Sequence, residues 1–321
     1  MEKVKVLFAV EGQESYVEKI QTLYPGLSMQ TVRNMDEMNN NLAEVEVLIT
    51  DFPGFDIEKA PQLKWVHWWS TGIECFKDTP LMHSNIVLTN SGGVSSKPIA
   101  EYVLSQMVSL SRDFSRMMRD QKKHLWNKDY FLEHRRSELR DKTLGIIGYG
   151  GIGREIARLA KCFGMSVMAT RQSATSREII EEVEVLPKND YKQLLATSDF
   201  VALSTALTQE TEGLIGEEEL RMMKPTAFLI NVTRGKVIND TALIKAMRGN
   251  WIAGAALDCF AEEPLPSSSE LWDLPNTLIT PHISGDTDQH NDRNADILCE
   301  NLQLYLNGEK CINIVDIARG Y

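Results

Sequence analysis

The sequence predicts an α/β protein in which a doubly wound parallel sheet is accompanied by a second, smaller α/β domain. Short apolar segments of strand length alternate with helical patterns along the 321 residues, and this alternation is typical of parallel sheets covered by helices on both faces. One apolar segment runs directly into glycines spaced G-x-G-x-x-G, a pattern that joins strand to helix in βαβ units. With 43% hydrophobic and 25% charged residues, the chain is long and apolar enough to bury two globular cores.

The first ninety or so residues are expected to form the smaller domain. Its strands are expected at 4–10, 45–50, 63–69 and 86–89, and its helix at 15–23. The turn after the third strand contains Thr71, Gly72 and Ile73. Because ligands of parallel sheets gather at the carboxyl ends of strands, the amides of this turn are candidates to bind a carboxylate. Trp68 and Trp69 precede the turn and are alternatively explained as core residues.

A long helix is expected to connect the two domains. Ser95-Ser96-Lys97-Pro98 opens it, because Pro is tolerated in the first helical turn. Apolar residues follow at helical spacing: Ile99, Val103, Leu104, Met107, Val108 and Leu110. The next segment, 121–142, is expected to be charged, irregular and solvated, with Trp126, Tyr130 and Phe131 able to cover a partner surface.

The larger domain is expected to be built around a βαβ unit at 143–171. Its parts are a strand at 144–147, a helix with Ile152, Ile156, Leu159, Ala160 and Phe163 on one face, and a strand at 166–169. Gly148 permits the tight turn, Gly150 lets the backbone approach a pyrophosphate, and Gly153 permits close contact between helix and strand. The alternative is an ordinary strand-to-helix connection, but the lengths of all three parts favour dinucleotide binding.

The end of the second strand indicates which dinucleotide is bound. An NAD site usually has Asp or Glu there, whereas this chain has Thr170-Arg171-Gln172. A guanidinium can pair with a 2′-phosphate in a bidentate fork, and a carboxylate would repel it. Arg171 therefore predicts that NADP(H) is preferred and that NAD(H) remains possible. The alternative is that Arg171 is a solvated surface charge.

The remaining elements complete the doubly wound sheet. Strands are expected at 200–203, 227–232, 253–257 and 277–280, and helices at 241–247 and 289–305. The last helix is expected to return to the first domain, with a final strand at 311–317. The expected dinucleotide-binding domain is thus 97–287, and the expected substrate-binding domain combines 1–96 with 288–321.

Three residues of the larger domain could carry chemistry, because each follows a predicted strand of one sheet. They are Arg234, Glu263 and His282. Reduction of a keto acid by hydride needs a cation to hold the substrate, a proton donor near neutral pH and a carboxylate to orient that donor. Taken singly, they could be a surface ion pair, a loop acid and a turn histidine.

With these residues in view, the chain resembles the D-isomer-specific 2-hydroxyacid dehydrogenase family over nearly its whole length. The matching motifs are GYGGIG at 148–153, N-x-x-R-G at 231–235, D-x-F-x-x-E-P-L at 258–265 and P-H-I-x-G at 281–285. The resemblance implies a Rossmann-type cofactor domain, a flavodoxin-like substrate domain and a homodimer formed through the cofactor domain. It also implies that His282 is the catalytic acid/base, hydrogen-bonded to Glu263, and that Arg234 is catalytic.

The resemblance also implies further contacts. Those with the cofactor are expected at Gly148, Gly150, Gly151, Ile152, Gly153, Arg171, Gln172, Ser204, Thr205, Thr211, Val232, Thr233, Arg234, Asp258, His282 and Gly285. Those with a small 2-keto or 2-hydroxy acid are expected at Thr71, Gly72, Ile73, Arg234 and His282. The chain departs from the family pattern at Glu74, where Asp is frequent, and at Ala206, where Pro is usual.

The expected reaction is the reduction of glyoxylate, hydroxypyruvate or a similar 2-keto acid by NADPH, because Thr170-Arg171-Gln172 is similar to NADPH-preferring glyoxylate/hydroxypyruvate reductases. A nucleotide-sensing binding protein, similar to the corepressors of this fold, is the alternative from another class. Oxidation of formate or phosphite is disfavoured, because Arg171 suits reduction driven by NADPH.

Composition excludes several other classes of partner. With 34 basic and 45 acidic residues, the net charge of −11 argues against nucleic acid or an anionic membrane as the main partner. Five cysteines without a C-x-x-C pair predict neither a metal site nor a disulfide framework, and they suit the reducing cytoplasm. No segment reaches the roughly 18 uninterrupted apolar residues of a membrane span.

Overall fold

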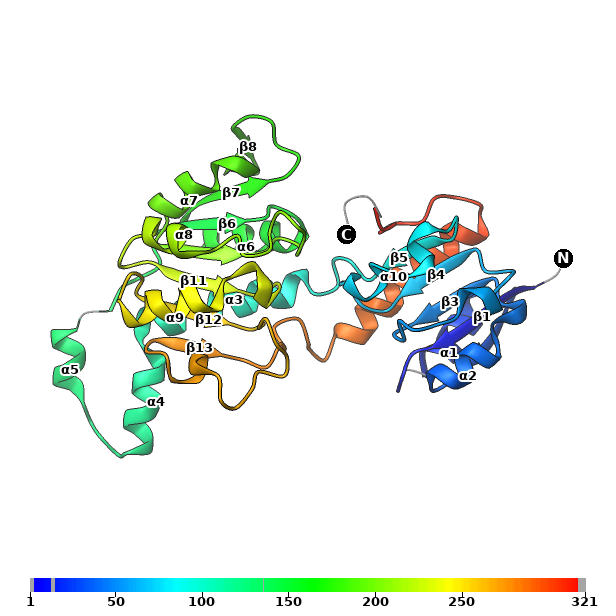
Figure 1. The fold of residues 1–321 in the computed structure, drawn as a ribbon, viewed down its shortest axis with the longest axis horizontal. Helices are drawn as coiled ribbons and strands as arrows, with labels where there is room; N and C mark the ends of the chain where they lie inside the picture. The colour runs from blue at the N-terminus through cyan, green and yellow to red at the C-terminus, as the bar shows by residue number, and fades with distance from the viewer. Residues whose placement is uncertain (1–2, 13–14, 135, 317–321) are drawn as a thin grey trace. The chain divides into compact units, whose positions relative to one another are not determined.

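A computed structural model describes residues 3–12, 15–134 and 136–316 of the chain. Its contacts divide the chain into two compact units. Unit 1 comprises the described residues up to Val94 together with those from Thr287 onward, and unit 2 is Ser95–Asp286. Each unit has its own sheet with helices around it (Figure 1).

Unit 1 is built on a parallel sheet with the strand order β2-β1-β3-β4-β5. Its strands are β1 Val4–Ala9, β2 Leu27–Thr31, β3 Val47–Thr50, β4 Trp65–Trp68 and β5 Val87–Asn90. This order is the flavodoxin-like one. β3 and β4 are buried along their whole length. Strands buried on both faces read as near-continuous apolar runs in the sequence, which is why these two were predictable.

Three α-helices cover the sheet of unit 1: α1 Ser15–Leu23, α2 Met35–Asn40 and α10 His290–Leu306. α10 is far from the others in sequence, yet its Leu298 and Leu302 share a buried cluster with Val6 and Trp65. Its last turn is also held by Tyr305, whose hydroxyl donates to Glu46 Oε1 at 2.7 Å. The chain therefore returns to unit 1 after completing unit 2.

The expected final strand at 311–317 is wrong for the residues that the structure describes, and Ile317 lies outside them. Ile314 instead forms an isolated antiparallel bridge with Thr89 of β5. Asn313 has a φ of +52°, a left-handed conformation that interrupts an extended chain. The segment therefore meets the sheet through one bridge.

Unit 2 contains a larger sheet with the strand order β13-β12-β11-β10-β6-β7-β9-β8. Its strands are β6 Thr143–Ile147, β7 Ser166–Arg171, β8 Glu178–Ile180, β9 Val183–Pro187, β10 Phe200–Leu203, β11 Phe228–Asn231, β12 Gly254–Leu257 and β13 Thr277–Ile279. All neighbouring strands pair in parallel except β8, which is antiparallel to β9. β8 and β9 form an edge hairpin.

Helices cover both faces of this sheet. They are α3 Ser96–Arg112, α6 Gly151–Cys162, α7 Tyr191–Thr197, α8 Glu217–Met222 and α9 Asp240–Arg248. On β10, Phe200 and Ala202 join the buried cluster that contains residues of α3 and α6. Val201 and Leu203 join the cluster that contains residues of α7, α8 and α9. Alternate side chains thus enter opposite cores, and the predicted doubly wound α/β fold is confirmed.

α6 follows the glycine loop as predicted, but one of its expected apolar contacts is wrong. Phe163 is the residue that ends the helix, and it is 46% exposed. Gly164 follows with a φ of +73°, which turns the chain back toward β7 and carries Phe163 out of the apolar face.

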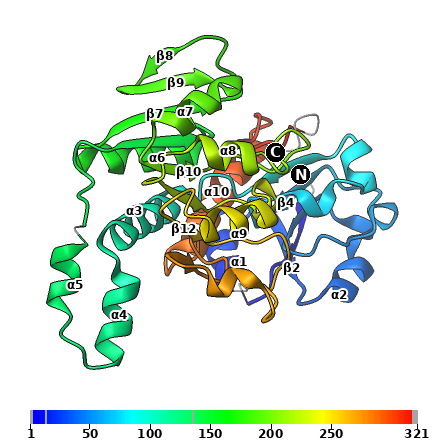
Figure 2. The ribbon, with the colours of Figure 1, turned by 60° about the vertical axis from the view of Figure 1, so that its left-hand side comes forward.

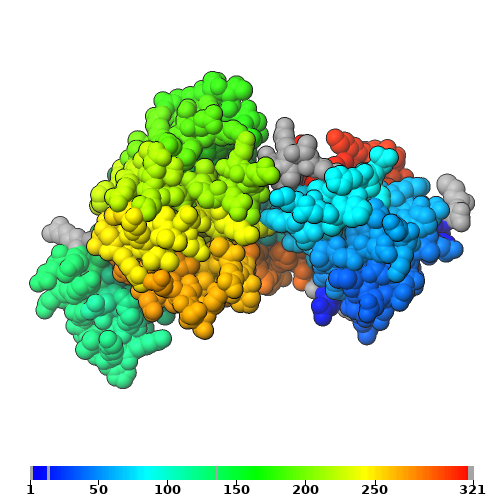
Figure 3. All heavy atoms as spheres, viewed as in Figure 1, coloured from blue at the N-terminus to red at the C-terminus, as the bar shows by residue number. Residues whose placement is uncertain are grey.

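Two short helices extend from the end of α3: α4 Phe114–Lys122 and α5 Lys128–Glu133. The expectation that 121–142 is irregular is therefore wrong at 121–122, which end α4, and over α5. Both helices stand away from the sheet of unit 2 (Figures 1 and 2), and Figure 3 shows the same segment projecting from the surface of that unit. Their exposed large apolar side chains are Phe114, Met117, Met118 and Leu132, with Leu125 and Trp126 between them. We call this pair of helices and its connection the α4–α5 arm.

Among the described helices, none combines the length and the apolar character that crossing a membrane requires.

Candidate active site

The carboxyl ends of six strands of unit 2 lie in line on one edge of its sheet. Their registers pair Thr170 with Ile147, Ile147 with Leu203, Leu203 with Asn231, Asn231 with Leu257, and Leu257 with Ile279. The segments that follow these positions begin at Arg171, Gly148, Ser204, Val232, Asp258 and Thr280. All the predicted catalytic and cofactor-binding residues lie on these segments. The topology therefore brings them to the edge where doubly wound sheets bind ligands.

The glycine loop fits a dinucleotide. Gly148 has a φ of +106°, and a Cβ there would lie 2.7 Å from the backbone of Ser204. A Cβ on Gly153 would overlap the carbonyl oxygen of Gly148. By contrast, a Cβ on Gly150 would meet nothing within 4 Å. Gly150 is the N-cap of α6, so the helix begins beside open space, where its first N–H groups can bind a pyrophosphate.

The two residues after Gly150 differ in exposure. Gly151 is exposed, and a Cβ there would lie 3.1 Å from Ser96 Oγ at the start of α3. Ile152 is half-buried and packs against the cluster of α3 and α6. The first turn of α6 therefore lies close to the first turn of α3.

Arg171 is the last residue of β7 and is half-buried. The exposed Gln172 follows, and its side chain hydrogen-bonds Glu210, whose pKa is lowered chiefly by its hydrogen bond with Lys188. No acidic residue stands at 171–173. The strand end thus offers a guanidinium at the position where NAD sites usually have a carboxylate.

The loop after β10 is tied to the glycine loop. Ser204 donates from Oγ to the carbonyl oxygen of Gly148 at 2.7 Å. Further along, Thr211 Oγ1 donates to Ala206 O and accepts from the amide of Thr208, both at 2.7 Å. Thr205, which follows Ser204 in the sequence, is half-buried. The hydroxyls of Ser204 and Thr211 therefore shape this loop.

A buried asparagine shapes the turn that presents Arg234. Asn231 is fully buried at the end of β11. Its Oδ1 accepts from the amide of Thr233 at 3.2 Å, and its Nδ2 donates to the carbonyl oxygen of Arg234 at 3.0 Å. The guanidinium of Arg234 donates from Nη1 to Thr233 O at 2.8 Å. Val232 and Thr233 are buried, so this turn holds Arg234 on a fixed backbone.

The turn of Arg234 packs directly on the segment that leads to Glu263. A Cβ on Gly235 would overlap the backbone of Phe260 and Ala261. Glu263 is fixed from the same segment, because its Oε1 accepts from the amide of Phe260 at 2.8 Å. Because Gly235 has no side chain, the backbone next to Arg234 packs directly against the segment that leads to Glu263.

Glu263 and His282 form a pair. Glu263 Oε2 lies 2.8 Å from His282 Nδ1, and the two side chains are 35% and 43% exposed. A carboxylate can only accept in this hydrogen bond, so Nδ1 carries the hydrogen, and Nε2 is the ring nitrogen that could exchange a proton. The distance is the one that orients a general acid or base.

Asp258 is fully buried, and its carboxylate holds the backbone that carries His282. Oδ1 accepts from the hydroxyl of Thr280 at 2.6 Å and from the amide of Ile283 at 3.0 Å, and Oδ2 accepts from the amide of Ser284 at 2.9 Å. His282 itself has a φ of +54°. Next to this loop, a Cβ on Gly285 would lie 2.9 Å from the side chain of Ser95.

The candidate turn of unit 1 offers unpaired amides. Trp68 Nε1 donates to Gly72 O, and Asn90 Nδ2 donates to Thr71 O, both at 2.8 Å. The amides of Thr71, Gly72 and Ile73 have no hydrogen-bond partner among the described residues. Such amides can donate hydrogen bonds to the oxygens of a carboxylate. Trp68 is only 6% exposed, so it is a core residue that also fixes this turn.

A family model described as "D-isomer specific 2-hydroxyacid dehydrogenase, NAD binding domain" matches residues 104–284. The chain belongs to this family. A glyoxylate reductase of Thermococcus gammatolerans is 35% identical over 291 residues, which are 88% of this chain and 83% of that protein.

Solved structures of the family agree over nearly the whole chain. One is the D-isomer specific 2-hydroxyacid dehydrogenase of Xanthobacter autotrophicus in complex with NADPH and MES, which is 28% identical with a TM-score of 0.86 and covers 99% of this chain and 100% of its own. A family protein of Aeromonas salmonicida is 29% identical with a TM-score of 0.85 and the same coverage. The predicted family and fold are thus confirmed, and this D-2-hydroxyacid dehydrogenase is an oxidoreductase with a nicotinamide cofactor.

Sequence reasoning overlooked the residues that hold the catalytic candidates in place. Asn231 and Gly235 lie inside a motif that was singled out for Arg234 alone. Asp258 was predicted to contact the cofactor, but its contacts with the His282 loop were not foreseen. A buried carboxylate at a strand end was the available signal, because such a group must find several donors.

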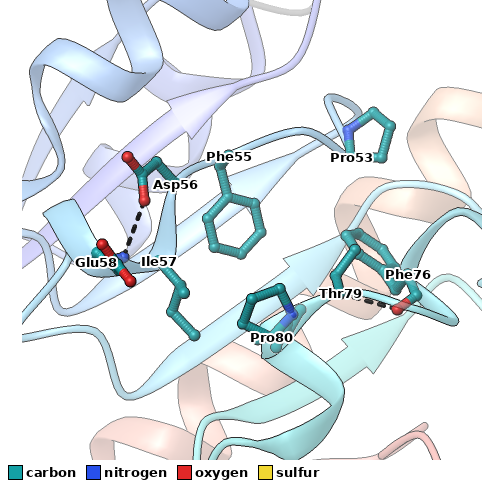
Figure 4. Close-up of a pocket in the computed structure, with 9 residues that line it drawn as sticks. Pro53, Phe55, Asp56, Ile57, Glu58, Phe76, Thr79 and Pro80 are labelled. Carbon is teal, nitrogen blue, oxygen red and sulfur yellow. Dashed lines mark hydrogen bonds between the residues drawn. The ribbon is translucent and has the colours of Figure 1, made fainter.

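A small pocket of about 240 Å³ in unit 1 contains none of the candidate residues. Figure 4 shows the side chains of Phe55, Ile57 and Pro80 lining it. On its rim, Asp56 Oδ1 accepts from the amide of Glu58 at 3.1 Å and caps a short helical turn. Asp56 on this rim therefore stabilises the local fold.

Proposed function

We propose that this dehydrogenase reduces a small 2-keto acid of the glyoxylate or hydroxypyruvate type with NADPH and forms the D-2-hydroxy acid. The observation that carries this proposal is the Glu263–His282 pair, with 2.8 Å between Oε2 and Nδ1, at the same sheet edge as the glycine loop and the turn of Arg234. The curated relative from Thermococcus gammatolerans, a glyoxylate reductase, supports this substrate class.

The proposed roles follow from the chemistry of each side chain. The reduced nicotinamide, when bound, supplies the hydride that C2 of the substrate receives. Arg234 pairs with the carboxylate of the substrate and polarises the adjacent carbonyl through its planar fork. His282, oriented through Nδ1 by Glu263, gives the proton on Nε2 to the carbonyl oxygen as it becomes an alkoxide. In the reverse direction, the neutral ring accepts this proton.

NADPH is the proposed reductant because of Arg171. Its position at the end of β7 suits a 2′-phosphate, which a guanidinium binds in a bidentate manner. The related structure from Xanthobacter autotrophicus was solved with NADPH, which supports the choice. We further propose that the cofactor contacts the glycine loop and Gln172. The other proposed contacts are Ser204, Thr205, Thr211, Val232, Thr233, Arg234, Asp258, His282 and Gly285. The amides of Thr71, Gly72 and Ile73 are proposed to bind a carboxylate.

The homodimer remains a proposal, and the α4–α5 arm supports it. Trp126 is 92% exposed and Met118 is 59% exposed, and a projecting group of large apolar side chains is typical of a protein interface. Light scattering is expected to give twice the chain mass. Trp126→Ser is expected to lower the dimer fraction at limiting concentration, whereas Trp272→Ser, which alters another exposed Trp of unit 2, leaves it unchanged. A monomeric wild type would contradict the proposal.

The five cysteines are free thiols, which supports the proposed cytoplasmic location, because free thiols persist in reducing compartments.

Steady-state kinetics test the cofactor and the substrate class together. NADPH consumption is measured with 2-keto acids and with their methyl esters, and the acids are expected to react while the esters do not. In wild type NADPH is expected to exceed NADH in kcat/KM. Arg171→Asp should lower kcat/KM with NADPH by the equivalent of about 1.5–3 kcal/mol, the range for a hydrogen bond to a charged group. Wild type that prefers NADH, or that reduces esters equally well, would overturn the proposal.

A further inference from the structure

A chain of hydrogen bonds connects α3 to the loop that carries His282. Tyr102, near the middle of α3, has its hydroxyl 2.6 Å from Thr280 Oγ1. The Thr280 hydroxyl is in turn 2.6 Å from Asp258 Oδ1. α3 packs against β11 and β12 on one face of the sheet of unit 2 (Figure 1). The phenol thus reaches the carboxyl edge of the sheet from a helix that contributes no candidate catalytic residue.

The direction of these hydrogen bonds follows from the number of hydrogens available. Asp258, as a carboxylate, can only accept, so Thr280 donates its single hydroxyl hydrogen to Oδ1. The short contact between Tyr102 and Thr280 must then be a bond in which the phenol donates. Burial raises the pKa of Tyr102 to about 12, so the phenol keeps its hydrogen at every pH used for assay.

Asp258 connects the Tyr102–Thr280 hydrogen bond to the loop that carries His282. It accepts from the amides of Ile283 and Ser284, the two residues directly after His282. On the other side, the amide of His282 donates to Thr280 O at 3.0 Å. The backbone of His282 is therefore bracketed by Thr280 and Asp258, while Glu263 fixes its ring.

We propose that Tyr102 is a positioning residue for the reaction: by donating to Thr280 it fixes the Thr280–Asp258 pair, which sets the backbone from which His282 delivers its proton. This inference rests on the proposed role of His282 as the proton donor. In the described part of the chain, Tyr102 forms no hydrogen bond with Glu263 or His282, so it acts through the loop alone.

Tyr102→Phe tests the proposal, because it removes one oxygen and keeps the ring. We expect kcat for keto acid reduction to fall on the order of tenfold, below the ~100-fold that a 1 Å misplacement costs, with the KM for the keto acid and the Kd for NADPH unchanged. We also expect a larger solvent deuterium isotope effect on kcat, because proton transfer becomes slower. Tyr191→Phe is the matched control, since the Tyr191 hydroxyl donates to Glu219 at 3.0 Å on the opposite face of the sheet.

Substitutions of Thr280 distinguish an effect of its hydrogen bonds from an effect of packing alone. Thr280→Ser keeps the hydroxyl and is expected to retain kcat, whereas Thr280→Val keeps the shape and is expected to lower it as Tyr102→Phe does. Adding Tyr102→Phe to Thr280→Val should then cause no further loss. The proposal is overturned if Thr280→Val is active while Thr280→Ser is impaired, or if Tyr102→Phe alters stability without changing kcat or the isotope effect.

His282→Gln distinguishes failure of this inference from failure of the proposed function. If His282→Gln keeps an ordinary rate, His282 is not the proton donor and both proposals fail. If His282→Gln is slow but Tyr102→Phe has the wild-type kcat and isotope effect, only the inference fails. If both are slow, the double variant should be no slower than His282→Gln alone, because Tyr102 acts through His282.

Discussion

Replacing Gly235 by alanine should uncouple the catalytic loops. The added Cβ would overlap the backbone of Phe260 and Ala261, far inside the 3.4 Å at which ordinary van der Waals contact begins. Backbone atoms cannot rotate away as a side chain can, so the two segments must separate by roughly 1 Å or more, the scale of misplacement that costs about 100-fold in rate. Glu263 should move with this segment, because its Oε1 accepts from the Phe260 amide at 2.8 Å.

The expected result for Gly235→Ala is a loss of about 100-fold in kcat, with a loss of stability of about 1–3 kcal/mol from overpacking. NADPH binding, followed by fluorescence, should persist, because the glycine loop follows a different strand. Persistent binding would show that unit 2 is folded. Gly26→Ala is the control, since a Cβ there meets nothing within 4 Å. A Gly235→Ala enzyme with the kcat and urea midpoint of wild type would refute the close packing of the two loops.

Three further predictions concern charge. Arg234→Lys keeps the charge but loses the planar fork. The kcat/KM for the keto acid should fall by the equivalent of about 1.5–3 kcal/mol, the range for a lost hydrogen bond to a charged group. Wild-type kinetics in this variant would show that Arg234 has only a structural role. Glu263→Gln replaces the carboxylate that accepts from His282 Nδ1 with a neutral amide, so kcat for reduction should fall while the KM for the keto acid is kept; a wild-type kcat would disprove the pairing. Burial lowers the pKa of His67 from 6.5 to about 3, so between these pH values the unfolded chain binds a proton at His67 and the folded chain does not. Unit 1 should therefore lose stability as the pH falls from about 6.5 toward 3, by up to ~1.4 kcal/mol per pH unit. Urea unfolding at several pH values, compared with His67→Gln, measures this slope.

The sequence predicted those elements whose pattern reports complete burial. β6, β10 and β11 are central strands with near-continuous apolar runs, and their positions agree with the structure to within a residue or two. β2 was missed because it lies at an edge of its sheet and alternates polar residues with Leu27 and Met29. The β8–β9 hairpin was missed for a related reason, since β8 has no buried residue and its turn places Glu181 and Glu182 at positive φ.

The catalytic candidates were accessible to sequence reasoning because they occur in motifs at strand ends. Their supports were not, because contacts across the sheet edge depend on three-dimensional placement. Tyr102 is a case in point: it lies among the apolar residues of α3, and nothing in the helical pattern indicates that its hydroxyl meets Thr280, 178 residues later. Gly235 likewise reveals its close contact with Phe260 only in the folded chain.

The most direct test of the account is the product formed from hydroxypyruvate and NADPH. The purified enzyme is incubated with both, and the configuration of the glycerate is determined by chiral chromatography alongside the loss of NADPH. The account predicts stoichiometric D-glycerate with wild type and almost none with His282→Gln. Formation of L-glycerate, NADPH loss without glycerate, or equal yield from His282→Gln would contradict it.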